Sequence, residues 1–430
     1  MKALFFVFVI SINAILLKAE NVDFEQKLEA LPHVVSVQGI EHHSFFKATY
    51  EIMFRQYLDH EDPEAGTFLQ RVFVSNYDIK SPVVYVAEGY TANYAAKPTY
   101  INELSEIIEA NQVVVEHRFF GKSMPDDVNW DYLTIENAAT DLHVIYEELK
   151  NIFDDTNKWI ATGISKGGQN TIAYKAFYPD DMDISVAYVG PVNYEVEDER
   201  MQNFLKSVGS EKCQEKIKDF QLAVLKSRDE IEVLVDSLSE AKNLTYSIPM
   251  EQVLDYSVLE YAFAFWQWGS DCAEIPADTA SPQKLFNHLI SVSGPGYFAK
   301  EGTESIKAFF VQAAKEFGYY GYYTEPFEDY LEIETAEGYI YDVFLNDFEP
   351  FEFSDETSRY IEKAILKDGE NLIMIYGEND PWTAGALEEN SQTKAVWFIK
   401  PDGSHRTRIG NMSYAQRAEI YKLLETLLEQ

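Results

Sequence analysis

The sequence predicts an α/β fold in which a mostly parallel sheet is covered by helices. Two observations support this prediction. Continuous apolar runs, such as PVVYVAEGY (82–90) and KWIATGIS (158–165), are typical of strands buried on both faces. Segments with helical spacing of apolar residues, such as 136–152, separate these runs along the chain. With 430 residues, the chain is long enough for a full core and an inserted region.

The predicted elements follow one another in a regular order. Residues 46–58 and 67–76 alternate apolar and polar positions, which indicates two half-exposed antiparallel strands. The elements that follow are strand 82–90, helix 98–110, strand 111–120, helix 136–152, strand 158–165, helix 167–179 and strand 184–192. After an interruption, the pattern ends with helix 355–367, strand 371–377, strand 395–400 and helix 413–429.

The interruption predicts the domain organisation. Residues 200–340 are rich in Tyr, Phe and Trp and indicate helices and loops with no clear buried strand. We therefore expect a helical cap, residues 197–350, inserted after the sixth strand. The first half of the sheet domain would cover residues 20–196 and the second half residues 351–430.

The N-terminus predicts export. Residues 1–19 combine an early Lys, an apolar run and a small residue, Ala19, before a cleavage point, as signal peptides do. Asn13 and Lys18 interrupt the run, so a membrane anchor fits less well. We expect a secreted or periplasmic protein without stable membrane insertion after signal cleavage. In that compartment Cys213 and Cys272, both in the predicted cap, are expected to form a disulfide rather than a metal site.

The charge limits the classes of partner. A net charge of −37 argues against nucleic acid and against anionic membranes. The charge serves solubility or, alternatively, a field that attracts cationic ligands such as the free amino groups of peptides.

Ser165 is the candidate nucleophile. It lies in ATGISKGGQN (161–170), at the end of a predicted strand and the start of a predicted helix. Gly163 and Gly167 would remove the Cβ clashes of a sharp nucleophile elbow, although a tight structural turn is the alternative. The elbow would offer the Lys166 backbone N–H as an oxyanion donor, with the Tyr90 N–H of the loop AEGYTAN as the second donor.

A serine nucleophile requires a base and an orienting acid. Of eight histidines, His405 alone lies in a loop directly after the last predicted strand. For the acid, Asp380 in GENDPW is favoured because it directly precedes Pro381, with Glu378 and Asp402 as fallbacks. The chain order Ser, Asp, His is the order of the α/β-hydrolase fold.

Several motifs extend the signal beyond the triad. In order they are VYVAEGYTANY, EHRFFGKSMP, GISKGG, WQWGSDCAEIP, GENDPW and GSHRTRI. Together they resemble the secreted bacterial prolyl tri/tetrapeptidyl aminopeptidase family of serine peptidases, over about residues 67–412. More distantly they are similar to prolyl carboxypeptidase and dipeptidyl peptidase II. The resemblance implies cleavage after proline near a free peptide N-terminus. Carried over, its triad falls on Ser165, Asp380 and His405.

The resemblance also implies a substrate site. Proline requires a small aromatic slot, for which Trp266, Trp268, Trp382 and Tyr90 are suitable walls; ordinary core aromatics are the alternative. The free amino group of the substrate requires a carboxylate, for which Glu88 and Glu274 are candidates, and a structural or surface acid is the alternative. We expect no cofactor and no metal.

Two other functions fit part of the pattern. An esterase or lipase would share the triad, but the predicted cap carries many Asp and Glu residues. A catalytically inactive scaffold that binds peptides usually lacks a triad member, and all three are present here.

Overall fold

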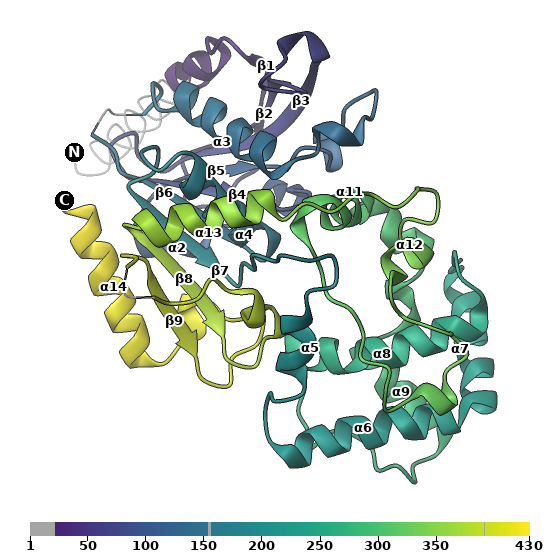
Figure 1. Cartoon of the computed structure of the whole chain (residues 1–430). Coiled ribbons are helices and arrows are strands. Elements are labelled where there is room, and N and C mark those ends of the chain that lie inside the picture. The colour runs from purple at the N-terminus through teal and green to yellow at the C-terminus, as the bar shows by residue number, and fades with distance from the viewer. Residues whose placement is uncertain (1–21, 154–155, 391) are drawn as a thin grey trace, which may run out of the picture. The chain divides into compact units, whose positions relative to one another are not determined.

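The computed structural model describes residues 22–153, 156–390 and 392–430 (Figure 1). The predicted signal peptide, residues 1–19, lies outside the described residues. The chain forms two compact units. The first contains the described residues up to Ala187, Gly369–Leu372 and Ala418–Gln430; the second contains Tyr188–Asp368 and Ile373–Arg417.

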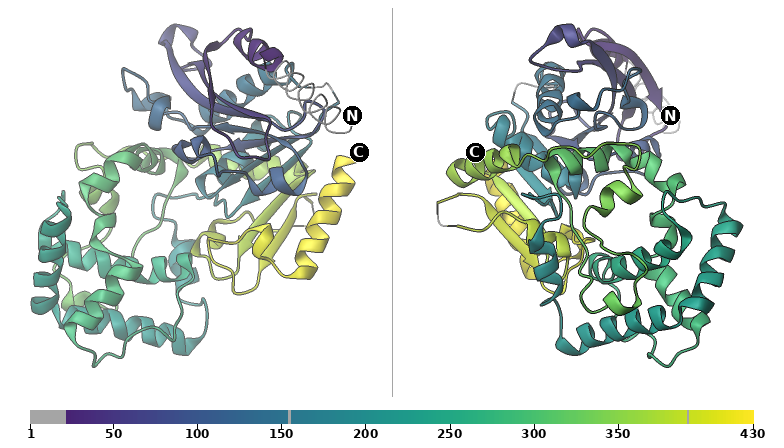
Figure 2. Two further views of the ribbon diagram at one scale, coloured as in Figure 1. Left: turned by 180° about the vertical axis from the view of Figure 1, so that it is seen from behind. Right: turned by 45° about the vertical axis from the view of Figure 1, so that its right-hand side comes forward.

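The first unit is built on a sheet whose strands lie in the order β1-β2-β3-β5-β4-β6-β7. The strands are β1 (Val34–Ile40), β2 (Ala48–Tyr57), β3 (Thr67–Asn76), β4 (Val83–Ala87), β5 (Asn111–Val115), β6 (Trp159–Ile164) and β7 (Ile184–Tyr188). Strands β1, β2 and β3 pair antiparallel, drawn in purple in Figure 2, whereas β4 runs parallel to both β5 and β6. All residues of β4 and β5 are buried, as the continuous apolar runs predict.

Strands β8 (Leu372–Gly377) and β9 (Val396–Lys400) complete a nine-stranded sheet and pair with each other in parallel. The boundary between the two units passes through β7 and β8. The Ser185 N–H donates to the Asn371 carbonyl in the first unit, at 2.9 Å, and the Val189 N–H donates to the Ile375 carbonyl in the second, at 2.7 Å. The predicted α/β-hydrolase fold is confirmed.

Two elements differ from the prediction. Strand β1 was not expected, because none of its residues is buried and apolar and polar positions alternate along only part of it. The strand that was counted as the sixth is therefore β7. The helix expected over 98–110 shortens to α2 (Glu103–Ile107), since the Asn102 side chain accepts from the Leu104 N–H and caps its first turn.

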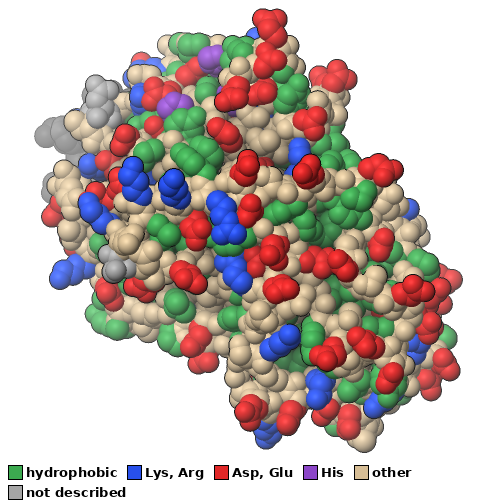
Figure 3. All heavy atoms as spheres, viewed as in Figure 1, with side chains coloured by type: hydrophobic (Ala, Val, Ile, Leu, Met, Phe, Trp, Pro, Cys, Tyr) green, Lys and Arg blue, Asp and Glu red, His purple; other side chains and the backbone are tan. Residues whose placement is uncertain are grey.

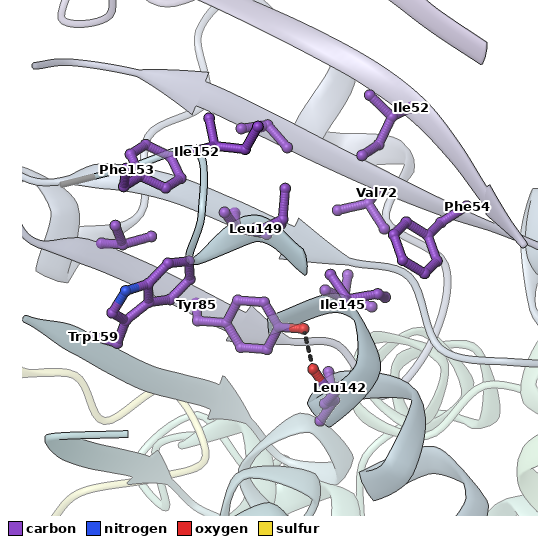
Figure 4. Packing of buried hydrophobic residues seen from close by; sticks show 14 of the residues in the cluster. Ile52, Phe54, Val72, Tyr85, Leu142, Ile145, Leu149, Ile152, Phe153 and Trp159 are labelled. Atoms are coloured by element: carbon purple, nitrogen blue, oxygen red, sulfur yellow. Dashed lines mark hydrogen bonds between the residues drawn. The ribbon is translucent and has the colours of Figure 1, made fainter. Parts of the chain in front are cut away.

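The other helices of the sheet domain are α3 (Ile135–Leu149), α4 (Lys166–Phe177) and α14 (Tyr414–Leu428). Helix α3 packs buried apolar residues against the sheet (Figure 4). Tyr85 of β4 lies within this core, and its hydroxyl donates to the Leu142 carbonyl of α3 at 2.8 Å. The bond satisfies the one polar group that the tyrosine brings into an apolar environment.

Helices dominate the second unit. They are α5 (Glu199–Leu205), α6 (Glu211–Lys226), α7 (Arg228–Lys242), α8 (Met250–Trp268), α9 (Pro282–Val292), α10 (Lys300–Thr303), α11 (Lys307–Gln312), α12 (Tyr339–Val343) and α13 (Glu356–Asp368). Helix α8 is buried over most of its length and is packed by α6, α7 and α9 (Figure 1). The expected disulfide joins Cys213 of α6 to Cys272, with their Cα atoms 5.6 Å apart.

The surface carries many acidic side chains, which are scattered over the face drawn in Figure 3. Within the described part of the chain, no helix has the length and apolarity that crossing a bilayer requires.

Candidate active site

Ser165 occupies a strained turn between β6 and α4. Its φ of 58° and ψ of −122° are rare for a residue with a side chain and cost about 1–3 kcal/mol. The two flanking glycines permit the turn. A Cβ atom would lie 2.7 Å from the Ala87 carbonyl oxygen at Gly163 and 2.6 Å from it at Gly167. This geometry is that of the predicted nucleophile elbow.

The loop after β4 packs against this elbow. A Cβ at Gly89 would lie 2.6 Å from the Lys166 Cβ, and the Asn170 side chain donates to the Glu88 carbonyl at 2.8 Å. The half-buried Glu88 carboxylate accepts hydrogen bonds from the Tyr94 hydroxyl and from the N–H groups of Gly89 and Tyr90. Burial raises the pKa of Glu88, and these donors and the Lys166 charge oppose the rise. In this structure the Tyr90 N–H therefore donates to the Glu88 carboxylate and not to an oxyanion site.

The Lys166 side chain is buried behind the elbow. Its Nζ lies 2.8 Å from His117 Nε2 and 5.5 Å from the centre of the Phe120 ring. His117 Nδ1 lies 2.7 Å from the Arg118 carbonyl, so we assign the ring proton to Nδ1 and the acceptor role to Nε2. Burial and the Lys166 charge hold the pKa of His117 well below its ordinary value. A neutral His117 thus helps to hold a buried ammonium group next to the elbow.

Asp380 and His405 meet in the second unit. Asp380 is fully buried after β8, where its Oδ1 accepts from the Trp382 N–H at 3.2 Å. Its Oδ2 lies 2.7 Å from His405 Nδ1. His405 lies in the loop after β9, and its backbone N–H donates to the Gln267 carbonyl at 2.9 Å. This arrangement orients the imidazole with Nδ1–H on the carboxylate and Nε2 available as a base.

The two fallback residues contact each other instead, side chain to backbone. Glu378 Oε2 accepts from the Asp402 backbone N–H at 3.0 Å. The carboxylate that the structure pairs with His405 is therefore that of Asp380.

Two of the predicted tryptophans contact His405. The Trp268 ring is 45% exposed and meets the imidazole nearly edge to face at 5.9 Å. Trp382 is buried at 6.5 Å from the imidazole, and its indole Nε1 has no acceptor among the described residues. Trp266 instead lines a pocket of about 150 Å³ together with Phe263 and Tyr322.

Glu260 is a buried acid that the sequence analysis missed. It lies on α8 and is 5% exposed, and its Oε2 accepts from the Tyr320 hydroxyl at 2.9 Å and the Tyr322 hydroxyl at 3.0 Å. Burial raises its pKa to about 7, although the two phenols act in the opposite direction. A single acid within the apolar run VLEYAFAF (258–265) was the available signal. Glu274, the predicted cap acid, is exposed.

One group of side chains in the first unit has the spacing of metal ligands. One ligand atom each of His143, Glu147 and Asp181 lie within 4.8 Å of one another. Asp181 Oδ2 lies 2.7 Å from His143 Nδ1 and accepts from the Tyr174 hydroxyl at 2.7 Å. These contacts account for the carboxylate without an ion.

The sheet order and the serine elbow define the class: an α/β-hydrolase. The chain belongs to the PS-10 peptidase S37 family, whose model matches residues 18–422. It is 29% identical to prolyl tri/tetrapeptidyl aminopeptidase from Streptomyces mobaraensis over 414 residues, which cover 93% of this chain and 84% of that protein. The chain is a serine peptidase.

Two further matches are weaker. A probable serine protease of Arabidopsis thaliana is 30% identical over 178 residues, which cover 37% of this chain and 36% of that protein. The solved structure of proline iminopeptidase from Mycobacterium smegmatis is 12% identical with a TM-score of 0.39, and the match covers 91% of this chain and 99% of that one.

Proposed function

We propose that the protein is an exported exopeptidase that cleaves after proline near the free N-terminus of peptides and releases short fragments ending in proline. The observation that carries the proposal is the buried Asp380–His405 pair with Trp268 and Trp382 beside it. The activity for which the Streptomyces mobaraensis relative is named supports the same substrate class.

In the proposed mechanism Ser165 is the nucleophile. His405 Nε2 takes the hydroxyl proton while Oγ attacks the carbonyl carbon of the prolyl residue. His405 then gives this proton to the departing amine as the C–N bond breaks, which leaves an acyl-enzyme ester on Ser165. Water, deprotonated by His405, attacks the ester carbonyl; the C–O bond to Ser165 then breaks as His405 returns the proton to Oγ, which releases the peptide acid. Asp380 holds the Nδ1–H and stabilises the imidazolium.

The developing oxyanion requires donors. We assign this role to the Lys166 backbone N–H, the first of α4, where the positive end of the helix dipole also favours an anion. The Tyr90 N–H stays a prediction as the second donor, because it would first have to turn away from the Glu88 carboxylate.

Aromatic walls explain a preference for proline. The pyrrolidine ring offers a rigid apolar shape and no N–H, so packing rather than hydrogen bonding must select it. Trp268 and Trp382 lie beside His405, and we assign this packing role to them. Trp266, in its own pocket on α8, would contact a more distant part of the substrate.

Export is supported by the predicted signal peptide and by the Cys213–Cys272 disulfide, which is typical of oxidising compartments. The secreted or periplasmic location stays part of the proposal, as do peptides with a free N-terminus as partners.

Initial rates on matched chromogenic substrates test the function. The panel contains free-amine Ala-Pro, Ala-Ala-Pro and Ala-Ala-Ala-Pro amides, an N-acetylated tripeptide amide, an Ala-for-Pro amide and a short acyl ester, with Ser165→Ala as the blank. We expect rapid turnover of free-amine proline amides only, with slow residual turnover of the N-acetylated amide and none of the Ala-for-Pro amide or the ester. Turnover of the ester without any proline amide would favour an esterase and overturn the proposal.

A further inference from the structure

Glu260 combines a buried charge with an incomplete set of partners. Both phenol hydrogen bonds reach Oε2, and no described residue donates to Oε1. Oε1 does not belong to the buried side-chain atoms that lack both a hydrogen-bond partner and solvent contact, so it keeps a small contact with solvent. No Lys or Arg among the described residues pairs with this carboxylate. Such a group favours a cationic partner, since a buried carboxylate is costly unless it is paired.

Helix α8 places Glu260 at a defined distance from the catalytic base. Glu260, Phe263 and Gln267 follow one another at i, i+3 and i+7 and share one face of the helix. The Gln267 carbonyl accepts from the His405 N–H. The seven steps of helical rise from Glu260 to Gln267 correspond to about 10 Å along the helix axis.

Aromatic rings cover the space between these two points. Trp382 contacts His405 at 6.5 Å and Phe263 at 5.3 Å between ring centres. Tyr320 stacks on Phe263 at 3.6 Å and lies 5.5 Å from Trp382, and its hydroxyl reaches Glu260. His405 and Glu260 are thus the two ends of one continuous aromatic strip within the second unit.

We propose that Glu260 binds the free α-amino group of the substrate and thereby determines that three residues precede the cleaved bond. This inference rests on the proposed function. An extended peptide covers about 3.3–3.6 Å per residue, so three residues span about 10–11 Å. With the prolyl carbonyl at His405, the N-terminal residue of such a three-residue segment places its ammonium group at Oε1 of Glu260. The ammonium group is then the cation that Glu260 lacks in the free protein, and it donates a charge-assisted hydrogen bond to the carboxylate.

The two acids named from sequence fit this role less well. The Glu88 carboxylate is already held by a phenol and two backbone N–H groups, with the Lys166 charge nearby. Glu274 is exposed, where a single ion pair contributes little.

Glu260→Gln tests the assignment, since the amide keeps an acceptor for the two phenols but removes the charge. Glu251→Gln is the matched control, because Glu251 is an exposed acid in the first turn of the same helix. We expect Glu260→Gln to lower kcat/KM for free-amine Ala-Ala-Pro amide by about 10–100-fold, mainly through KM. Turnover of the N-acetylated tripeptide should change by less than about threefold, and Glu251→Gln should match the wild type on both substrates.

A length series gives a second readout that needs no variant. The wild-type enzyme digests unlabelled decapeptides with proline at position 2, 3, 4 or 6, and mass spectrometry identifies and quantifies the products over time. Fastest release of the fragment ending at position 3 is expected. Fastest cleavage at position 2, 4 or 6 would overturn the inference even if Glu260→Gln did not fold.

The outcomes separate the inference from the proposed function. If the wild type prefers free-amine substrates and folded Glu260→Gln keeps the same preference, only the inference fails. It also fails if both substrates lose activity equally in that variant, because the role is then structural. If the wild type cleaves free and acetylated peptides equally well, both the inference and the proposed function fail.

Discussion

At the residue scale, the two oxygens of Asp380 have separate tasks. Oδ1 caps the short helix Pro381–Gly385 by accepting the Trp382 N–H, and Oδ2 faces His405 Nδ1. The hydrogen bond to the Trp382 N–H fixes the orientation of the Asp380 carboxylate, and the carboxylate in turn fixes the orientation of the imidazole. Because Pro381 starts this helix, the Asp-Pro sequence explains why Asp380 is positioned and the nearby Glu378 is not.

Asp380→Asn is expected to lower kcat by about 10⁴-fold, because the amide N–H₂ can favour the wrong tautomer of His405 without changing the geometry. The comparison is made on the free-amine tripeptide amide, with circular dichroism as the check on folding. Glu378→Gln should keep a kcat close to wild type. A tenfold loss or less in Asp380→Asn, or an equal loss in both variants, would contradict the assignment.

Glu260 makes a testable contribution to the pH dependence of stability. Its pKa is about 7 in the folded protein against an ordinary 4.5, so the folded state retains a proton between these values that the unfolded state loses. Its contribution is complete below pH 4.5 and is lost as the pH rises to about 7. The neighbouring phenols stay neutral in this window, because the ordinary pKa of a phenol, 10, lies above it and burial raises theirs further; they are Tyr319, Tyr320, Tyr322 and Tyr339.

The free energy of unfolding of the wild type minus that of Glu260→Gln should therefore fall by about 3 kcal/mol between pH 4.5 and 7.5. Urea denaturation at closely spaced pH values measures it, and Glu251→Gln serves as the control. A difference that is constant with pH would show that Glu260 is ionised throughout.

At the element scale, the elbow depends on close contact between β6, α4 and the loop after β4. Gly163→Ala would place a Cβ 2.7 Å from the Ala87 carbonyl oxygen, closer than atoms tolerate, and should cost about 1–3 kcal/mol of unfolding free energy. Gly39→Ala in β1 is the control, since its nearest contact would be an ordinary 3.8 Å. Equal thermal denaturation midpoints for the two variants would argue against a tightly packed elbow.

The disulfide joins α6 to the segment after α8 across 59 residues of chain. Replacing Cys213 and Cys272 by serine should cost about 2–4 kcal/mol, mainly because the unfolded chain gains freedom. Calorimetry with and without reductant measures the change. The double variant should be insensitive to reductant, and a wild type that is equally insensitive would contradict a stabilising disulfide.

Elements and residues differ in how far the sequence predicts them. The strands β4, β5 and β6 are predictable because burial on both faces demands an apolar run. Ser165, Asp380 and His405 can be proposed as a triad from the sequence because each lies in a local motif next to a strand. Glu260 is not, because its partners Tyr320 and Tyr322 lie 60 and 62 residues further along the chain and only tertiary packing joins them.

At the scale of the whole molecule, the proposed triad draws on both compact units. Ser165 belongs to the first, and Asp380 and His405 belong to the second together with Glu260 and the aromatic strip. The predicted cap limits, 197–350, stay a prediction, since the division into units also places β9 and the loops after β8 and β9 in the second. The net charge of −37 suits the proposed substrate, because a negative molecule attracts peptides that carry a free ammonium group.

The most direct test of this account is to label the protein with a fluorophosphonate and to locate the adduct by peptide mass spectrometry. The account predicts a single adduct on Ser165 that is absent in Ser165→Ala and forms far more slowly in folded His405→Gln. An adduct on another serine, or an active enzyme in which Ser165 stays unmodified, would contradict it.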